Sequence, residues 1–308
     1  MLLEDWRQPI DMEWIGHWRS SGQHAAADYW QARLKLAEKA DPPAWPQEEM
    51  THWDGTVYRE HLRDEAARNA RRTDGNRMRA RWQYLFGPTD KSRWAGNWVI
   101  DVGCGEGETA LTLANPATLG YRYVGVDLSR NGLQCARQDS PSGDYVQADV
   151  EHLPFRPNSA RALLVLGTLH HLRDWRAVLV DALDLAMDDA QILIYEAIER
   201  PVGLSRFALA RRLGRLAKES EHENRISAQA LLSVIATHAE IEHVEYEYSP
   251  VRTALVHFLG SRLTTNSRLT SVVLWLDHFT IRTLGHFVPV FGAGAIFVRA
   301  IRSRRAPI

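Results

Sequence analysis

The residues best suited to chemistry lie in one short run, residues 99–107, which reads Val-Ile-Asp-Val-Gly-Cys-Gly-Glu-Gly. Apolar residues end in a carboxylate, Asp101, and glycines follow at alternate positions, 103, 105 and 107. A helix-forming segment comes next, over 108–114. Glycines at a turn from strand to helix permit positive φ angles and let a ligand approach the bare backbone. The run therefore predicts a ligand-binding loop between a strand and a helix.

The charge of Asp101 indicates the charge of that ligand. A carboxylate at this place is unfavourable beside a pyrophosphate but suits a cation. S-adenosylmethionine carries a sulfonium and an ammonium group and fits this requirement. The rival interpretation is the dinucleotide fingerprint G-x-G-x-x-G: Gly103 and Gly105 match it, but Glu108 stands at the third glycine position. A glycine turn without a ligand is the remaining alternative.

Two further acids follow predicted strands. Residues 121–126 predict a second strand that ends in Asp127, and 144–148 predict a third that ends in Asp149. An acid about 20 residues beyond a glycine loop is where a ribose is held in doubly wound folds. A carboxylate at Asp149 can accept a hydrogen bond from an adenine amino group. Either acid can instead cap a helix, since Asp is favoured at N-caps, and for Asp127 this alternative stays open.

The following segments alternate between strands and helices. Apolar runs predict strands at 160–166 and 191–197, with a helix over 174–187 between them. Strands at 241–248 and 293–301 complete a set of seven. This order predicts an α/β fold, a Rossmann-like seven-stranded and mostly parallel sheet with helices on both faces. Ligands bind at the carboxyl ends of the strands in such sheets, which is where the acids fall.

Four stretches of the chain, 99–111, 124–129, 148–155 and 163–172, resemble the class I S-adenosylmethionine-dependent methyltransferases. Within them, the chain is similar to the small-molecule branch typified by ubiquinone and menaquinone biosynthesis. The resemblance implies that S-adenosylmethionine is the cofactor. It also implies a set of cofactor-binding residues: Asp101, Gly103, Cys104, Gly105, Gly107, Asp127, Leu128, Asp149, Val150 and Gly167. In similar enzymes the segment before the first strand folds over the cofactor, which would bring Arg81 and Tyr84 to its carboxylate.

Catalysis is expected after the fourth and fifth strands. His170 and His171 follow the fourth strand, and histidine has the pKa for proton transfer near neutrality. We expect His170 to act as a base or a substrate contact, and His171 to have a more structural part. Glu196 ends the fifth strand and is an alternative contact. No cluster has convincing metal-ligand spacing, so the enzyme is expected to be metal-independent.

The predicted function is methyl transfer to a small molecule, with oxygen favoured over nitrogen or carbon as the acceptor atom. One alternative is a cyclase, an isomerase or another non-methylating enzyme that binds S-adenosylmethionine on the same fold. The other is a non-catalytic partner module.

The predicted organisation is an N-terminal helical extension, 1–90, and a methyltransferase domain, 91–308, with helical insertions at about 200–238 and 251–284. Nine of the 11 tryptophans precede residue 99 and either cap the sheet or line an aromatic pocket. The predicted helix over 204–218 is basic and is a solvated face, an anion-facing lid or a weak membrane-surface contact. Together these segments suggest a bulky, partly apolar acceptor.

Composition excludes several classes. A formal charge of −1 gives no general attraction to nucleic acid. Two cysteines make a disulfide framework improbable. The start of the chain lacks the pattern of a signal peptide, and the longest apolar stretch, 288–298, is too short to span a bilayer. We therefore expect a cytoplasmic protein.

Overall fold

The computed structural model describes residues 94–112, 120–199, 226–247, 249, 252, 255, 267–284 and 294–303. Several expectations lie outside the described residues: the extension 1–90 with Arg81 and Tyr84, the basic segment 204–218, and most of 251–266.

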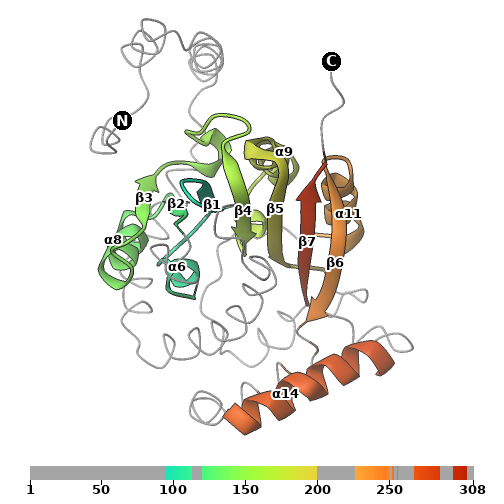
Figure 1. The fold of residues 1–308 in the computed structure, drawn as a ribbon. Coiled ribbons are helices and arrows are strands. Elements are labelled where there is room, and N and C mark those ends of the chain that lie inside the picture. The colour runs from blue at the N-terminus through green and yellow to red at the C-terminus, as the bar shows by residue number, and fades with distance from the viewer. Residues whose placement is uncertain are drawn as a thin grey trace, which may run out of the picture.

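Seven strands form one sheet, in the order β3-β2-β1-β4-β5-β7-β6 (Figure 1). The strands are β1 Trp98–Val102, β2 Arg122–Asp127, β3 Asp144–Gln147, β4 Ala160–Leu166, β5 Ala186–Ala197, β6 Ala239–Glu247 and β7 Ala295–Arg302. Strand β7 is antiparallel to both of its neighbours, and every other neighbouring pair is parallel. The predicted seven-stranded, mostly parallel α/β sheet is thereby confirmed.

The helices fall between the strands. They are α6 Glu108–Thr112, α8 Arg130–Asp139, α9 Trp175–Leu185, α11 Ala228–Ala236 and α14 Ser267–Phe279, with short turns η3 Val150–His152 and η4 Leu169–His171 and a π-helical turn η5 Thr280–Leu284. The structure ends α9 two residues before the predicted 187. The reason is that Ala186 pairs with Ala160 of β4, so the chain joins the sheet directly after the helix.

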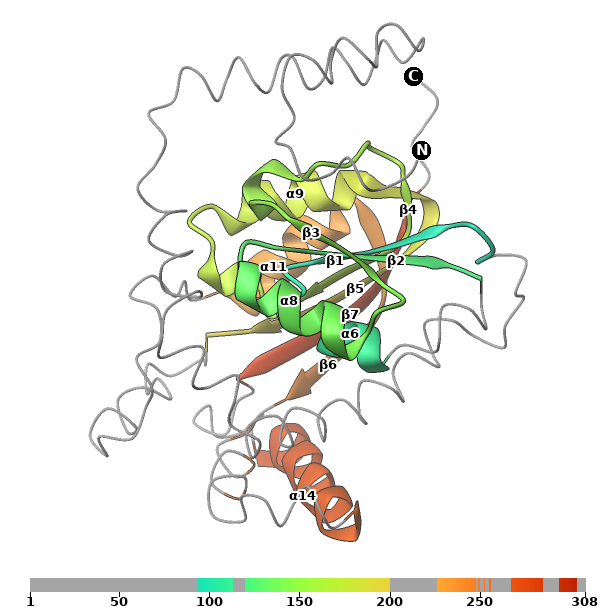
Figure 2. The same cartoon turned by 90° about the vertical axis from the view of Figure 1, so that its left-hand side faces the viewer.

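Both faces of the sheet are buried. Along β1, Ile100 packs in a core with α9 and α11, whereas Val99 packs in a second core with Leu133 of α8. Figure 2 shows α9 and α8 on opposite sides of the strands. Successive residues of a strand point to opposite faces, so both must be apolar here, and this explains the near-continuous apolar runs in the sequence.

One edge of the sheet collects the carboxyl ends of six strands. Strands β1 to β5 run in the same direction, and β6 does too because β7 is antiparallel to both β5 and β6. We call this edge the carboxyl edge. Helix α14 lies beyond it, away from the helices on the two faces, in both views (Figures 1 and 2). In the described part of the chain, no helix is long and apolar enough to cross a membrane.

Candidate active site

The glycine loop after β1 is fastened to β2. The backbone N–H groups of Gly103 and Cys104 donate to the carbonyl of Val126, at N···O distances of 2.8 and 2.9 Å. Gly103 has a φ of +74°, and a Cβ there would lie 2.1 Å from Oγ1 of Thr168. Thr168 itself donates to the carbonyl of Val102 at 3.0 Å. Glycine at 103 is therefore required by close packing against the turn that follows β4.

Gly105 and Gly167 differ from Gly103, because they border open space. Their φ angles are +52° and +74°, and a Cβ at either position would have no heavy atom of the described residues within 4 Å. Gly107 instead packs against Ala136 of α8, since an added Cβ would lie 2.7 Å from the Cβ of that residue. The carboxyl edge therefore offers bare backbone at two points, 105 and 167, where a ligand can approach closely.

Asp127 joins the glycine loop to the end of β2. Its Oδ2 accepts from the N–H of Gly105 and its Oδ1 from the N–H of Ser129, both at 2.8 Å. The N-cap of α8 is Ser129, whose hydroxyl accepts from the N–H of Gly132 at 3.0 Å. The capping alternative for Asp127 is therefore wrong. A carboxylate has about four acceptor sites, so the same side chain can hold the loop and accept from a ligand.

Asp149 does cap a helical turn. It is the N-cap of η3, and its Oδ1 accepts from the N–H of Glu151 at 2.9 Å. Its neighbour Val150 is buried in the core. Leu128 is half-buried at the end of β2, and its carbonyl accepts from the side-chain amide of Gln147 at 3.1 Å.

Asp101 is a buried carboxylate at the end of β1. Its Oδ2 accepts from the hydroxyl of Tyr123 at 2.7 Å, and its Oδ1 has no hydrogen-bond partner within the described structure. Burial raises the pKa of Asp101 to about 6, although the hydrogen bond from Tyr123 opposes the shift. A cation brought to this carboxyl would favour its ionised form.

Cys104, in the glycine loop, has a buried side chain. Burial raises the pKa of its thiol well above the ordinary value, and the negative charges of Asp127 and Asp101 add to the shift. A thiol held protonated in this way is a poor nucleophile, so Cys104 serves packing within the loop.

The structure brings His170 and Glu196 together. Nδ1 of His170 is hydrogen-bonded to Oε1 of Glu196, which is fully buried near the end of β5. Glu196 also accepts from the backbone N–H of Leu169 at 2.7 Å and of Ala197 at 2.9 Å. The ring of His171 lies beside that of His170, with centroids 3.9 Å apart and a tilt of 43°.

This pairing fixes the chemistry available to His170. Because the carboxylate accepts at Nδ1, the proton sits on that nitrogen and Nε2 becomes the basic ring nitrogen. The imidazole is oriented by a group that is itself held by two backbone donors. A base oriented by a buried carboxylate is a recurring arrangement in proton transfer.

Sequence reasoning missed three of these residues. Tyr123, Thr168 and Ser129 hold Asp101, the glycine loop and α8, respectively. Only Ser129 had a usable signal, since it stands directly before a helix and serine is a favoured N-cap. The other two form bonds to residues 22 and 66 positions away, which no local pattern indicates.

Residues 100–193 match a family described as a methyltransferase domain. The match runs from β1 into β5 and includes the glycine loop, Asp127, Asp149 and His170. Residues 100–193 therefore form a methyltransferase domain. S-adenosylmethionine is the cofactor of this domain, and the dinucleotide interpretation is set aside.

Two curated relatives each match about a quarter of the chain. Over 87 residues it is 38% identical to the 2-phytyl-1,4-naphtoquinone methyltransferase of Nostoc punctiforme, a match that covers 26% of this chain and 37% of that protein. Over 70 residues it is 39% identical to the trans-aconitate 2-methyltransferase of Paracidovorax citrulli, covering 23% of this chain and 26% of that protein. The matches thus span well under half of these relatives.

One solved structure extends the likeness to the fold of most of the chain. It is the complex between the Haloferax volcanii Trm112 methyltransferase activator and a methyltransferase, with a TM-score of 0.50 at 16% identity. The alignment covers 81% of this chain and 99% of that one. At this identity the likeness concerns the fold alone.

The residues of the methyltransferase domain fit the cofactor. Bare backbone at Gly105 and Gly167 leaves room for it at the carboxyl edge. The buried oxygen Oδ1 of Asp101, with no partner within the described structure, offers a negative group to a cationic ligand. Within the described residues no group of His, Cys, Asp and Glu has the arrangement of a metal site.

Proposed function

We propose that the protein transfers a methyl group from S-adenosylmethionine to a hydroxyl of a small, partly apolar molecule, with His170 as the general base. The pairing of His170 with the buried Glu196 at the carboxyl edge is the observation that supports this best. A base is needed when the nucleophile is a hydroxyl, because its proton must leave as the new bond forms. A neutral amine attacks through its own lone pair and can release its proton to water after the transfer, so the base favours oxygen over nitrogen; a carbon acceptor would also need a base to remove its proton.

When bound, the cofactor supplies an already activated methyl group, so positioning accounts for most of the catalysis. Nε2 of His170 accepts the proton of the acceptor hydroxyl. Glu196 is a positioning residue that holds the proton on Nδ1 and stabilises the imidazolium that results. His171, whose ring lies against that of His170, limits the movement of the base.

The cofactor-binding assignments follow the same edge. Asp101 faces the cationic methionine part, which the backbone at Gly103, Gly105, Gly107 and Gly167 borders. Asp127 accepts from the ribose hydroxyls and Leu128 packs on the adenine, while Asp149 accepts from the adenine amino group beside Val150. Arg81 and Tyr84 are assigned to the cofactor carboxylate. In this proposal the N-terminal helices and the segments 204–218 and 251–284 roof the acceptor pocket above His170.

The decisive experiment has two stages. Calorimetry first measures binding of S-adenosylhomocysteine, expected with a dissociation constant in the micromolar range, about −8 kcal/mol. Phenols, hydroxyquinones and hydroxylated acids are then incubated with S-adenosylmethionine, and mass spectrometry follows both products. The expected result is one class of acceptor that gains a methyl group as S-adenosylhomocysteine appears. Binding without transfer to any acceptor would indicate a non-methylating use of the fold, and no binding at millimolar ligand would overturn the proposal.

A further inference from the structure

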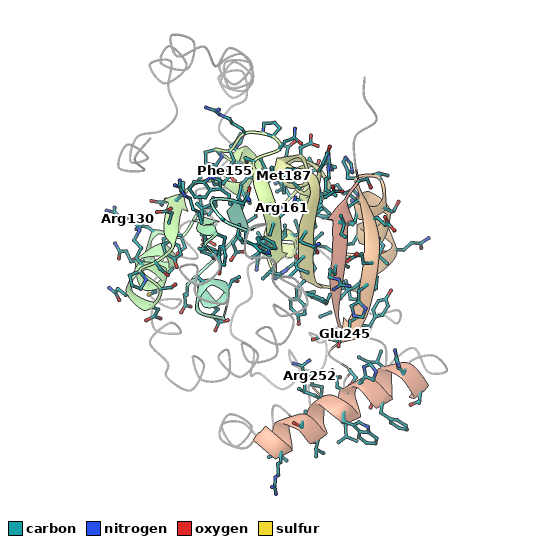
Figure 3. The ribbon with its side chains drawn as sticks, in the orientation of Figure 1. Arg130, Phe155, Arg161, Met187, Glu245 and Arg252 are labelled. Carbon is teal, nitrogen blue, oxygen red and sulfur yellow. The ribbon has the colours of Figure 1, made fainter. Side chains whose placement is uncertain are left out.

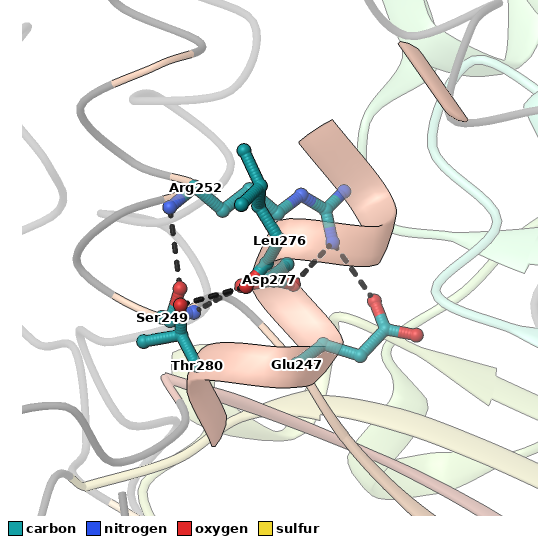
Figure 4. A network of polar contacts seen from close by, with 6 residues as sticks. All are labelled: Glu247, Ser249, Arg252, Leu276, Asp277 and Thr280. Atoms are coloured by element: carbon teal, nitrogen blue, oxygen red, sulfur yellow. Dashed lines mark hydrogen bonds and ion pairs between the residues drawn. The ribbon is translucent and has the colours of Figure 1, made fainter. Parts of the chain in front are cut away.

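Helix α14 is fastened to the carboxyl edge by a buried polar network (Figure 4). The guanidinium of Arg252 lies 3.2 Å from Oε2 of Glu247, at the end of β6, and 3.5 Å from Oδ2 of Asp277 in α14. Oδ1 of Asp277 accepts from the N–H of Ser249 at 2.7 Å. All four residues are buried. Ion pairs removed from water are costly to break by losing one partner, so this network fixes α14 to the end of β6.

The opposite side of α14 is exposed and aromatic. Trp275 is 62% exposed, Val272 53% and Phe279 47%, and the two rings are stacked with centroids 5.4 Å apart. The spacing of three and four residues places all three side chains on one helical face. Large apolar side chains gathered on one exposed face mark an interaction surface more often than scattered ones do.

The charges on the same face are all of one sign. Arg268 and Arg282 are exposed near the two ends of the aromatic stretch. Position 268 continues the three- and four-residue pattern of 272, 275 and 279, whereas Arg282 lies in the π-helical turn η5 that follows α14. Asp277 is the acid of α14, and it is 2% exposed and paired with Arg252. The exposed face of α14 is therefore aromatic at its centre and cationic at its ends.

We propose that this face of α14 docks the protein on an anionic lipid surface. Tryptophan and phenylalanine beside arginines, with no exposed acid on the described helix, form the pattern of an interfacial helix. The occupant is argued from charge: arginines attract an anionic leaflet, whereas a second copy of the same face would oppose arginines to arginines. A stable interface between two proteins also uses about 20–30 residues from each partner, and three exposed apolar side chains are too few to form one.

The position of α14 determines how the docked protein would be oriented on the lipid surface. The helix lies beyond the carboxyl edge and is tied to the end of β6 (Figures 1 and 4). Docking through it turns the carboxyl edge, with His170 and the glycine loop, toward the lipid. This inference stands on exposure and charge alone and does not depend on the proposed reaction.

Sedimentation with sucrose-loaded vesicles tests the proposal on the full chain. In 0.1 M salt the protein is expected to bind phosphatidylcholine vesicles containing 30% phosphatidylglycerol at least tenfold more tightly than pure phosphatidylcholine. The variant Trp275→Ser/Phe279→Ser is expected to bind the anionic vesicles at least tenfold more weakly. Arg268→Glu/Arg282→Glu is expected to lose the preference for anionic lipid, since each arginine near such a surface contributes a factor of about five.

A charge-matched control distinguishes the effect of the exposed α14 face on vesicle binding from the effect of the protein's net charge. Arg130 and Arg156 are exposed elsewhere, and Arg130 begins α8, far from α14 (Figure 3). The variant Arg130→Glu/Arg156→Glu changes the net charge equally and is expected to bind vesicles within threefold of the wild type. Unchanged S-adenosylhomocysteine binding and thermal midpoints show that the variants are folded. If Trp275→Ser/Phe279→Ser fails to fold, the two arginine pairs still provide the comparison.

Three outcomes would overturn the inference. The first is no binding of the wild type to anionic vesicles. The second is equal binding by the α14 variants, which would place membrane contact elsewhere in the chain. The third is a dimer in analytical ultracentrifugation that becomes a monomer in Trp275→Ser/Phe279→Ser, which would identify the face as a contact between two copies.

Discussion

The carboxylate of Glu196 and the imidazole of His170 form a hydrogen-bonded pair, although Glu196 lies near the end of β5 and His170 lies in the turn η4 that follows β4. Glu196 is fully buried and His170 is partly exposed, with 17% of its side chain accessible. Neighbouring parallel strands β4 and β5 bring the residues together, because the carboxyl ends of both strands reach the same edge. The pair thus combines a rigid interior acceptor with a base that a substrate can reach.

Removal of the base is expected to slow methyl transfer. His170→Ala should lower kcat for a hydroxyl acceptor by roughly 10²–10⁴-fold, with little change in the affinity for S-adenosylhomocysteine. The measurement is steady-state transfer at saturating acceptor. His243, exposed on β6 away from His170, supplies the control, and His243→Ala should leave the rate unaltered. An undiminished rate in His170→Ala, with chemistry rate-limiting, would remove this residue from the mechanism.

Glu196→Gln tests the positioning role separately. The amide keeps the shape of the side chain but no longer holds the Nδ1 proton as a carboxylate does, so kcat should fall by about tenfold to a thousandfold. The pH–rate profile should also shift. Its acid limb, on which the base becomes protonated, should move to lower pH because the imidazolium loses its counter-charge. A profile identical to that of the wild type would show that Glu196 serves folding only.

Asp127 is expected to act in both binding and stability. Asp127→Ala should weaken binding of S-adenosylhomocysteine by about 1.5–3 kcal/mol. Because Asp127 also accepts from the N–H groups of Gly105 and Ser129, we expect a loss of about 1–3 kcal/mol in the free energy of unfolding. Calorimetry and urea unfolding measure the two quantities. Ser129→Ala removes only the cap of α8, so it should cost about 1 kcal/mol of stability at unchanged affinity.

Alanine at Gly105 should block the cofactor without a clash inside the protein. The positive φ of Gly105, +52°, costs a non-glycine residue about 1–2 kcal/mol. Gly96 is the matched control. Its φ is +73°, its added Cβ also has no atom of the described residues within 4 Å, and it precedes β1 at the other end of the strand. Both alanine variants should lose similar stability in urea unfolding. Only Gly105→Ala should lose affinity for S-adenosylhomocysteine, and equal affinities would refute the assignment.

The buried carboxyl of Asp101 should make stability fall as pH rises. Its pKa is raised from 3.8 in the unfolded chain to about 6 in the fold. The folded state therefore binds this proton more tightly, and its contribution is lost between about pH 4 and pH 6. Above pH 6 the ionised group costs about 3 kcal/mol. Asp101→Asn should consequently have a larger free energy of unfolding than the wild type at pH 7.5, by up to that amount. At pH 5 the difference between the two proteins should be smaller.

The same carboxyl should make cofactor binding depend on pH. Affinity for S-adenosylmethionine should weaken below pH 6, as Asp101 becomes neutral and no longer attracts a cation. In Asp101→Asn the affinity should be lower at pH 7.5 and nearly independent of pH between 5 and 7.5. Calorimetry across this range measures both effects. Parallel pH profiles in the two proteins would contradict a direct contact between Asp101 and the cofactor.

Much of the fold could be read from the sequence, because its signals are local. Strand β4 has the predicted bounds, 160–166, since a run of apolar residues buried on both faces is visible in the sequence itself. The glycine run after β1 predicted a tight loop, and positive φ angles at Gly103, Gly105 and Gly107 agree. Alternation of strands and helices then determines a parallel sheet, and with it the edge where Asp101, His170 and Glu196 gather.

The partners of those residues depended on the tertiary structure. Asp127 and Asp149 look alike in sequence, yet only Asp149 caps a helical turn, because Ser129 occupies the cap of α8. His170 and Glu196 were separate candidates until the pairing of β4 with β5 placed one against the other. The hydrogen bonds of Asp101, Thr168 and His170 join residues more than 20 positions apart in the chain. Local sequence patterns cannot predict contacts of this kind.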